Sequence, residues 1–263
     1  MKKTEHRPTE RVLDILELLS SHPEGLTLTE ISDKIKSPIS TIYPIVHTMS
    51  ERKFLYSDKN TSRYSIGISS YGVGISYANN TNVFKFIKMQ MQYIVNQAKE
   101  ICQLGVLDKN EVFYIAKVES DEPIRLVSSI GKKFPAYCTA MGKSLLCNKD
   151  LAALKVLYPE GLKAYTENTV TSFDELYKQT SKIKVDGFAS EFGELNDYKH
   201  CVAVPLFNDE KVIAALSVSI PAFRANSEKI ELTKKLLLEV RSEIEKYFAE
   251  NHVNTDMLLY GDY

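Results

Sequence analysis

Two closely spaced helix starts constrain the fold of this chain more than any other feature. Thr27-Leu-Thr-Glu30 is a capping box, in which the first hydroxyl accepts from the backbone N–H of the fourth residue and the fourth side chain reaches back. Ser37 is then expected to cap a further helix, with Pro38 at its first position, where a missing N–H costs nothing. Two capped helices in so short a span predict a helix-turn-helix.

The segments on either side extend this motif. Thr9 is expected to cap an earlier helix that runs to about Ser21 and ends at His22-Pro-Glu-Gly25. Its predicted inward face consists of Val12, Leu13, Leu16 and Leu19. After the third helix, two short strands around residues 54–56 and 63–66 flank a polar turn. This order predicts a winged helix-turn-helix, in which the third helix enters the DNA major groove and the wing lies along the adjacent backbone.

The third helix contains an internal proline. Its apolar residues Ile42, Ile45, Val46 and Met49 have the spacing of one helix face, yet Pro44 removes a backbone hydrogen bond between them. Because these apolar side chains still anchor the segment to the first two helices, we predict a helix that persists, with a bend near residues 40–44.

The rest of the chain predicts an α+β effector-type domain. Residues 67–100 have a helical pattern interrupted near residue 80, which indicates a linker helix followed by the first helix of a second domain. Short β-type runs follow near residues 102–107, 112–118, 124–127, 202–207 and 212–220. Helical stretches are expected at about 140–147, 151–157, 173–184 and 227–249. Together these predict an antiparallel sheet flanked by helices.

Bulk properties exclude several classes of protein. The net charge is −1, and residues 1–75 carry ten Lys and Arg against nine Asp and Glu, so any affinity for DNA depends on where the charges lie. The N-terminus lacks the apolar run of a signal peptide, and apolar stretches are too short to span a bilayer. Four scattered cysteines have no zinc-type spacing. We therefore expect a cytoplasmic protein with reduced thiols, no metal, no cofactor and no membrane contact.

Several motifs in order resemble those of IclR-type bacterial transcriptional regulators. The resemblance covers about residues 9–250 and rests on the following stretches: Arg11-Val-Leu-Asp-Ile-Leu-Glu-Leu-Leu, Ser40-Thr-Ile-Tyr, Arg63-Tyr-Ser-Ile-Gly, Val118-Glu-Ser, Arg125-Leu-Val-Ser, Cys138-Thr-Ala-Met-Gly-Lys-Ser-Leu-Leu, Cys201-Val-Ala-Val-Pro-Leu and Ala215-Leu-Ser-Val-Ser-Ile-Pro221. It implies a winged helix-turn-helix at residues 1–67, a linker helix at 68–82, a GAF-like effector-binding domain at 83–250 and a tail at 251–263. It also implies a homodimer or homotetramer that binds an operator in double-stranded DNA, and repression is the expected sense of regulation.

Polar and basic side chains of the third helix and the wing are the candidate DNA contacts. They are Lys36, Ser37, Ser40, Thr41, Tyr43, Arg52, Lys59 and Arg63, and they are expected to reach phosphates or base edges. For each Ser or Thr, a capping or solvated hydroxyl is an equal alternative. The sequence departs from the family at two places, since Ile39 and Pro44 stand where relatives commonly carry a basic residue and an Arg.

A carboxylate-binding pocket is expected in the second domain. Helix amides at the start of Thr139-Ala-Met-Gly-Lys143 suit a carboxylate. By resemblance, the pocket residues are Ala140, Met141, Glu191, Cys201, Ser217 and Ser219. The spacing of the two serines independently places both hydroxyls on one face of a strand, although bonds to neighbouring backbone are an alternative explanation for them. Glu191 replaces a common Asp, and a small acid or keto acid with hydroxyl groups is the expected effector.

The sequence disfavours two enzymatic interpretations, a phosphate-binding loop and a cysteine nucleophile. Met-Gly-Lys-Ser at residues 141–144 lacks the second glycine of a phosphate loop, because Tyr137 stands five residues before Gly142. Cys201 has His200 next to it, but neighbours on a strand point to opposite faces, which disfavours a thiolate–imidazole pair. We therefore expect no catalytic residue. The alternative function is a GAF-like small-molecule sensor or enzyme without specific DNA binding.

Overall fold

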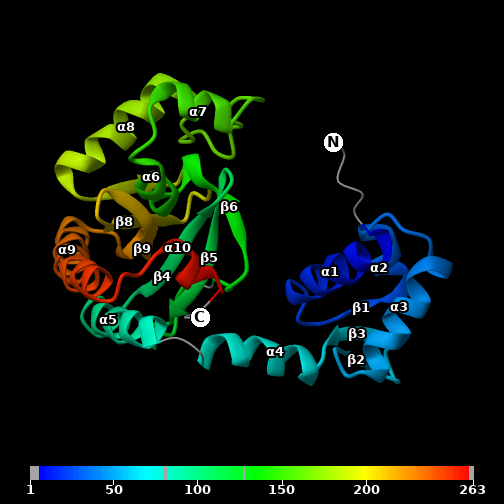
Figure 1. Ribbon diagram of the computed structural model, residues 1–263. Coiled ribbons are helices and arrows are strands. Elements are labelled where there is room, and N and C mark those ends of the chain that lie inside the picture. The colour runs from blue at the N-terminus through cyan, green and yellow to red at the C-terminus, as the bar shows by residue number, and fades with distance from the viewer. Residues whose placement is uncertain (1–5, 80–81, 127, 261–263) are drawn as a thin grey trace. The chain divides into compact units, whose positions relative to one another are not determined.

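The computed structural model describes residues 6–79, 82–126 and 128–260 (Figure 1). The chain divides after residue 80 into two compact units, which are described one at a time. No described helix is both long enough and apolar enough to cross a membrane.

The N-terminal unit is a winged helix-turn-helix, as predicted. It consists of α1 (Arg7–Ser20), β1 (Leu26–Thr27), α2 (Leu28–Lys34), α3 (Ile39–Glu51), β2 (Leu55–Ser57) and β3 (Arg63–Ile66). The three strands form an antiparallel sheet in the order β1-β3-β2. The helices close over a core of Ile15, Leu19, Leu26, Ile31, Ile42, Val46, Met49 and Leu55. The β2–β3 hairpin is the wing.

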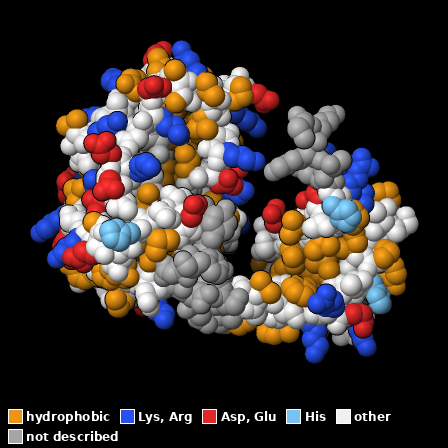
Figure 2. All heavy atoms as spheres, in the orientation of Figure 1, with side chains coloured by type: hydrophobic (Ala, Val, Ile, Leu, Met, Phe, Trp, Pro, Cys, Tyr) orange, Lys and Arg blue, Asp and Glu red, His pale blue; other side chains and the backbone are white. Residues whose placement is uncertain are grey.

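The start of α1 differs from the prediction. The helix begins at Arg7 with His6 at the N-cap position, so Thr9 is not its cap. Pro8 explains the difference, because proline is pre-organised for the first turn of a helix. The inward face is also rotated, since Ile15 is fully buried whereas Leu13 is 54% exposed. Figure 2 shows apolar side chains gathered on the face of this unit where α1 lies.

The start of α2 confirms the capping box. The Thr27 backbone N–H donates to Glu30 Oε2 over 2.7 Å, and the Glu30 N–H donates to Thr27 Oγ1 over 3.3 Å. The prediction for Ser37 is wrong, because Pro38 occupies the N-cap position of α3 and no side chain caps the helix there. Ser37 is instead buried, and its hydroxyl has no hydrogen-bond partner among the described residues.

Helix α3 continues through Pro44, as predicted. Ile42, Val46 and Met49 are buried against the core, which explains why the helix persists despite a missing backbone donor. The Thr48 hydroxyl donates to the carbonyl of Pro44 over 2.7 Å. The bend near residues 40–44 stays a prediction.

The C-terminal unit contains a six-stranded antiparallel sheet. Helix α4 (Ile68–Asn79) lies in the range predicted as a linker, and α5 (Asn82–Ala98) opens the second unit. The strands are β4 (Ile101–Asp108), β5 (Glu111–Val118), β6 (Lys133–Pro135), β7 (Ala189–Phe192), β8 (Lys199–Asn208) and β9 (Lys211–Pro221), in the order β6-β5-β4-β9-β8-β7. This is the antiparallel sheet expected for the domain.

Helices cover both faces of this sheet (Figure 1). On one face lie α5 and α9 (Ser227–Glu250), which pack on each other and on the strands. On the other lie α6 (Ala140–Leu146), α7 (Leu151–Leu157) and α8 (Phe173–Asp186), with the short helix η1 (Ala136–Cys138) leading into α6. Short edge strands β6 and β7 were not predicted. The strand predicted at residues 124–127 is wrong for residues 124–126, which have no regular structure, and Val127 lies outside the described residues.

The tail packs on its own domain. It includes the short helix α10 (Thr255–Tyr260), and both Val253 and Leu258 are fully buried. The Asn208 side-chain amide donates to the Val253 carbonyl over 2.7 Å, which fixes the segment to the end of β8. Residues 253–258 of the predicted tail therefore dock on the C-terminal unit.

Candidate DNA-binding surface and effector pocket

The predicted DNA contacts occupy different environments in the N-terminal unit. Ser40 and Tyr43 are exposed on α3, and Thr41 is half-buried. Lys36 lies exposed before α3, Arg52 at its end and Lys59 in the wing turn. Ser37 is buried, so its side chain does not reach the surface from which the others project.

Arg63 has a role within the fold. Its Nη1 donates to the Gly25 carbonyl over 2.7 Å and to Glu30 Oε2 over 3.2 Å. The wing strand β3 is thereby tied to the capping box of α2. The Thr27 backbone N–H and hydroxyl hold the pKa of the Glu30 carboxyl below its usual value. Burial opposes them, and Arg63 adds a further lowering. This guanidinium orients the wing, and its predicted contact with DNA stays a prediction.

The predicted carboxylate site begins at the start of α6. The Thr139 hydroxyl accepts from the Gly142 N–H over 3.0 Å, whereas the amides of Ala140 and Met141 lie too early in the helix to have an intrahelical acceptor. Gly142 is required here because a Cβ would lie 2.1 Å from the carbonyl oxygen of Ala136 in η1. The backbone of η1 therefore packs directly against the first turn of α6 at Gly142.

Strand register brings the other predicted pocket residues to one face of the sheet. Glu191 lies opposite Cys201, and Cys201 lies opposite Ser219. The Cys201 thiol and the Ser219 hydroxyl are 3.3 Å apart, and the Ser219 hydroxyl donates to Gln103 Oε1 over 3.4 Å. Ser217 occupies the next inward position on β9, opposite Ala203. Side-chain partners therefore account for Ser219 better than backbone partners.

This face of the sheet is the one that α6 covers. Cys201 belongs to the same buried cluster as Ala140 and Met141. Gly105 of β4 makes room for α6, since a Cβ there would lie 2.4 Å from Met141 Sδ. The six residues predicted for the effector are consequently all buried around the contact between the start of α6 and the central strands.

One carboxylate oxygen of the buried Glu191 is unsatisfied. It is 3% exposed, its Oε2 accepts from the Glu194 N–H over 3.1 Å, and its Oε1 has no hydrogen-bond partner among the described residues. Lys199 Nζ lies 4.0 Å from Oε1, close enough for an ion pair and too far for a hydrogen bond. Burial raises the pKa of this carboxyl, and Lys199 opposes the rise.

Cys201 is not arranged as a nucleophile. Burial raises the pKa of its thiol to about 12, so the thiolate is scarce at neutral pH. The His200 ring is bonded to the Ser190 hydroxyl over 2.7 Å on the other face of the sheet, as the strand alternation predicted. The adjacent cysteine and histidine therefore form no catalytic pair.

Sequence reasoning missed several residues around the predicted effector residues. Lys143 is 1% exposed, forms a very short ion pair with Glu194 and donates to Gln179 Oε1 over 2.7 Å. The pair links α6 to the loop that follows Glu191. One signal in the sequence pointed to it, because a lysine placed among Ala, Met and Leu in a largely apolar helix needs a buried partner.

Gln103, Tyr114 and Lys199 also belong to this environment. Gln103 is buried beside Ser219, and the pKa of the Tyr114 phenol is raised chiefly by burial and also by the nearby Cys201 and Glu191. Gln103 had a signal of its own, since it is a polar residue in an apolar strand. Tyr114 and Lys199 had none, because only strand pairing brings them near Glu191.

Two family models match the chain. The model for the bacterial transcriptional regulator IclR C-terminal domain matches residues 75–246, which is more than half of the chain, and the model for the IclR helix-turn-helix domain matches residues 8–59. The chain belongs to the IclR family. It is therefore a DNA-binding transcriptional regulator, and α3 is its recognition helix.

Relatives of this IclR-family protein match along most of their length. The HTH-type transcriptional regulator KdgR of Escherichia coli (strain K12) is 30% identical over 224 residues, 84% of each chain. The crystal structure of an IclR transcriptional regulator from Alicyclobacillus acidocaldarius is 27% identical, with a TM-score of 0.84 over 92% of this chain and 99% of that one. An IclR homolog from Microbacterium hydrocarbonoxydans, complexed with 4-hydroxybenzoate, is 19% identical, with a TM-score of 0.75 over 91% and 99% of the two chains.

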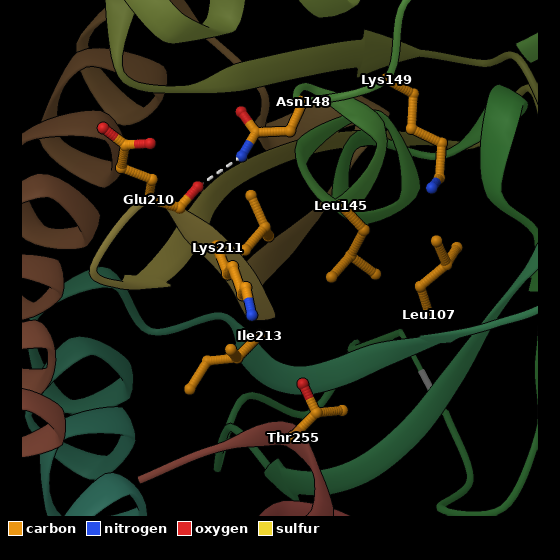
Figure 3. Close-up of a pocket in the computed structure, with 9 residues that line it drawn as sticks. Leu107, Leu145, Asn148, Lys149, Glu210, Lys211, Ile213 and Thr255 are labelled. Carbon is orange, nitrogen blue, oxygen red and sulfur yellow. Dashed lines mark hydrogen bonds between the residues drawn. The ribbon is translucent and has the colours of Figure 1, made fainter. Parts of the chain in front are cut away.

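A separate surface pocket of about 340 Å³ lies near the end of α6 in this IclR-family protein (Figure 3). Leu107, Leu145 and Ile213 line it together with Lys149 and Lys211, and Thr255 of the tail closes one side. The Asn148 side-chain amide donates to the Glu210 carbonyl across its rim over 2.7 Å. None of the predicted effector residues is among those that line this pocket, so the two places are distinct.

Proposed function

We propose that this IclR-family protein is a repressor whose operator binding responds to a small hydroxylated carboxylic acid held in the C-terminal domain. The observation that carries the effector proposal is the buried Glu191 Oε1, which has no hydrogen-bond partner among the described residues. A buried acceptor without a donor costs free energy, and an effector hydroxyl supplies that donor.

The carboxylate of the effector is assigned to the opposite side of the same pocket. The amides of Ala140 and Met141 begin α6 without intrahelical acceptors, and the positive end of the helix dipole favours an anion there. Cys201, Ser217 and Ser219 supply polar groups between these amides and Glu191. The homolog from Microbacterium hydrocarbonoxydans is complexed with 4-hydroxybenzoate, which has both groups.

Coupling to DNA is proposed to run through oligomer geometry. An effector that binds one arrangement of a dimer or tetramer better than another shifts the population toward it, and the spacing of the recognition helices changes with it. The Lys143–Glu194 ion pair joins α6 to the loop after β7, so a ligand bound beside Glu191 contacts elements that are already linked. Because it acts on operators, we propose that the protein works in the cytoplasm. Repression is tested with an operator-driven reporter, whose expression should rise in a strain that lacks the protein.

Ligand titration of the full-length protein tests the effector site. A panel contains hydroxylated carboxylic acids, each paired with an analogue lacking the hydroxyl and with its methyl ester. The expected result is a rise in Tm for some acids, since a ligand at 100 times its Kd adds about 2.7 kcal/mol of stability. The ester should have no effect, and the analogue without the hydroxyl should bind more weakly.

Variants locate the site. Glu191→Gln should reduce the preference for the hydroxylated acid, and Cys201→Ser with Ser217→Ala should weaken the response while leaving DNA affinity unchanged. Ser190→Ala is the matched control, because Ser190 lies on the same strand and faces the opposite side. Identical titrations of the Glu191→Gln variant and the wild type would remove Glu191 from the site.

A further inference from the structure

The recognition helix α3 exposes an apolar and aromatic stripe. Ile39 and Tyr43 are 43% and 52% exposed and lie four residues apart, which places them on one face of the helix. His47 continues the stripe, with its ring centroid 6.0 Å from that of Tyr43. The opposite face holds Ile42, Val46 and Met49 in the core, so the stripe is the side of α3 that faces outward.

Helix α3 has no Lys or Arg. Across residues 39–51 its one fully charged side chain is Glu51, at the last position. The commonest specific base contact is a bidentate bond from Arg or Lys to guanine O6 and N7, and this helix has no such donor. An apolar side chain in the major groove has a different partner, the C5 methyl group of thymine, which no other base carries.

Cations lie at both ends of the stripe. Lys34 and Lys36 precede α3, and Arg52 and Lys53 follow it, all of them exposed. An uncharged stripe between two groups of cations complements a groove lined by bases between two phosphate strands. This charge arrangement favours duplex DNA over an apolar protein surface as the partner of the stripe.

We infer that α3 reads thymine through its C5 methyl groups, which contact Ile39 and the Tyr43 ring. The inference rests on the DNA-binding function of the family and names the bases that this chain selects. Thymines lie opposite α3 in each half-site, and guanines there meet no bidentate Arg or Lys from this helix. Burying one methyl group changes affinity about fourfold, which sets the expected effect for each thymine.

Replacing thymine by deoxyuridine in the operator tests this, because the two bases differ only by the methyl group. The operator is first selected from random duplexes with the full-length protein. Each thymidine in the footprint is then replaced singly, and Kd is measured by gel shift. We expect about a fourfold loss of affinity at one or more thymines of each half-site. Unchanged affinity at every substituted position would overturn the inference. This experiment needs no protein variant.

Protein variants assign the contact. With Ile39→Ala or Tyr43→Ala, the thymine–deoxyuridine difference should disappear at the contacted position, whereas Tyr43→Phe should retain it. Val156→Ala is the control, since Val156 is 81% exposed in the other unit and should leave the difference intact. A change in self-association with the base difference preserved would show instead that protein covers the stripe, and would overturn the assignment. Failure of the wild type to select any sequence would contradict the DNA-binding function itself.

Discussion

The two units of this protein differ in where their charged side chains lie. In the N-terminal unit, charges lie at the surface, the Arg63–Glu30 pair is half-exposed and the reading face of α3 is uncharged. In the C-terminal unit, Lys143, Glu191 and Glu194 are almost completely buried. Buried charge costs stability unless it is paired, and among the described residues it occurs in the C-terminal unit. The described core of the N-terminal unit is apolar, the buried Ser37 hydroxyl excepted, and its other candidate DNA contacts reach the surface.

Breaking the buried pair should have the largest effect. Lys143→Met leaves the Glu194 carboxylate without its ammonium partner, and loss of one member of a buried pair costs about 3–5 kcal/mol. The free energy of unfolding, measured in urea by circular dichroism, should fall by this amount. Lys178→Met is the control, because the exposed Lys178–Glu175 pair should contribute less than about 1 kcal/mol.

A second substitution checks the cause. Adding Glu194→Gln to Lys143→Met removes the unpaired charge and should recover part of the lost stability. If the double variant were as unstable as Lys143→Met alone, the loss would come from packing, and the contrast between the two units would not rest on charge.

The capping box of the N-terminal unit should contribute less to stability than the buried ion pair. Thr27→Ala removes the hydroxyl that accepts from the Glu30 N–H, and loss of such a cap costs about 1 kcal/mol. Hydrogen exchange followed by mass spectrometry should show faster exchange in α2 and unchanged exchange in the C-terminal strands. Thr29→Ala, at an exposed position in the same helix, should be neutral or slightly stabilising. Equal effects of the two substitutions would argue against the capping box.

The smallest effect concerns pH, and the two units should respond with opposite signs. Glu30 has a lowered pKa, so its contribution to stability is present above its usual value of 4.5 and is lost as the pH falls below it. Glu191 has a raised pKa, so between 4.5 and its raised value the folded state retains a proton that the unfolded chain has lost. The stability of the C-terminal unit therefore falls as the pH rises through that window.

Glu191→Gln should remove this fall. Unfolding curves between pH 4.5 and pH 8 should show a flatter pH dependence in the variant and higher stability at neutral pH. Glu210→Gln, at an exposed position on the β8–β9 turn, is the control and should retain the slope of the wild type. The same slope in Glu191→Gln and the wild type would assign it to another group.

Local signals in the sequence predicted most of the fold. The capping box and the apolar face of α3 depend on neighbours within a few residues, so they were recoverable from sequence alone. The errors came where two local signals compete: Pro8 starts α1 before Thr9 can cap it, and Pro38 takes the position expected for Ser37. Leu13 was predicted to face the core, but Ile15 does so instead. A helix rich in leucine has more than one apolar face, and only packing selects between them.

The surroundings of the predicted effector residues were harder to predict because they depend on strand pairing. The alternation of β9 placed Ser217 and Ser219 on one face, but the neighbours Gln103, Tyr114 and Lys199 come from strands whose register no local pattern encodes. Strand β7, which carries Glu191, has only four residues and was not predicted. The Lys143–Glu194 pair joins residues far apart in the chain and required the fold to be seen.

The separation of cations from the reading face of α3 has a consequence for how salt acts. Counterion release scales with the number of phosphates neutralised, for which the exposed Lys36, Arg52, Lys53 and Lys59 are the candidates, and phosphates are the same at every site. Base selection by uncharged side chains releases no counterions. A rise in ionic strength is therefore expected to lower the affinity for all operators by a common factor, while the rank order of those affinities stays the same.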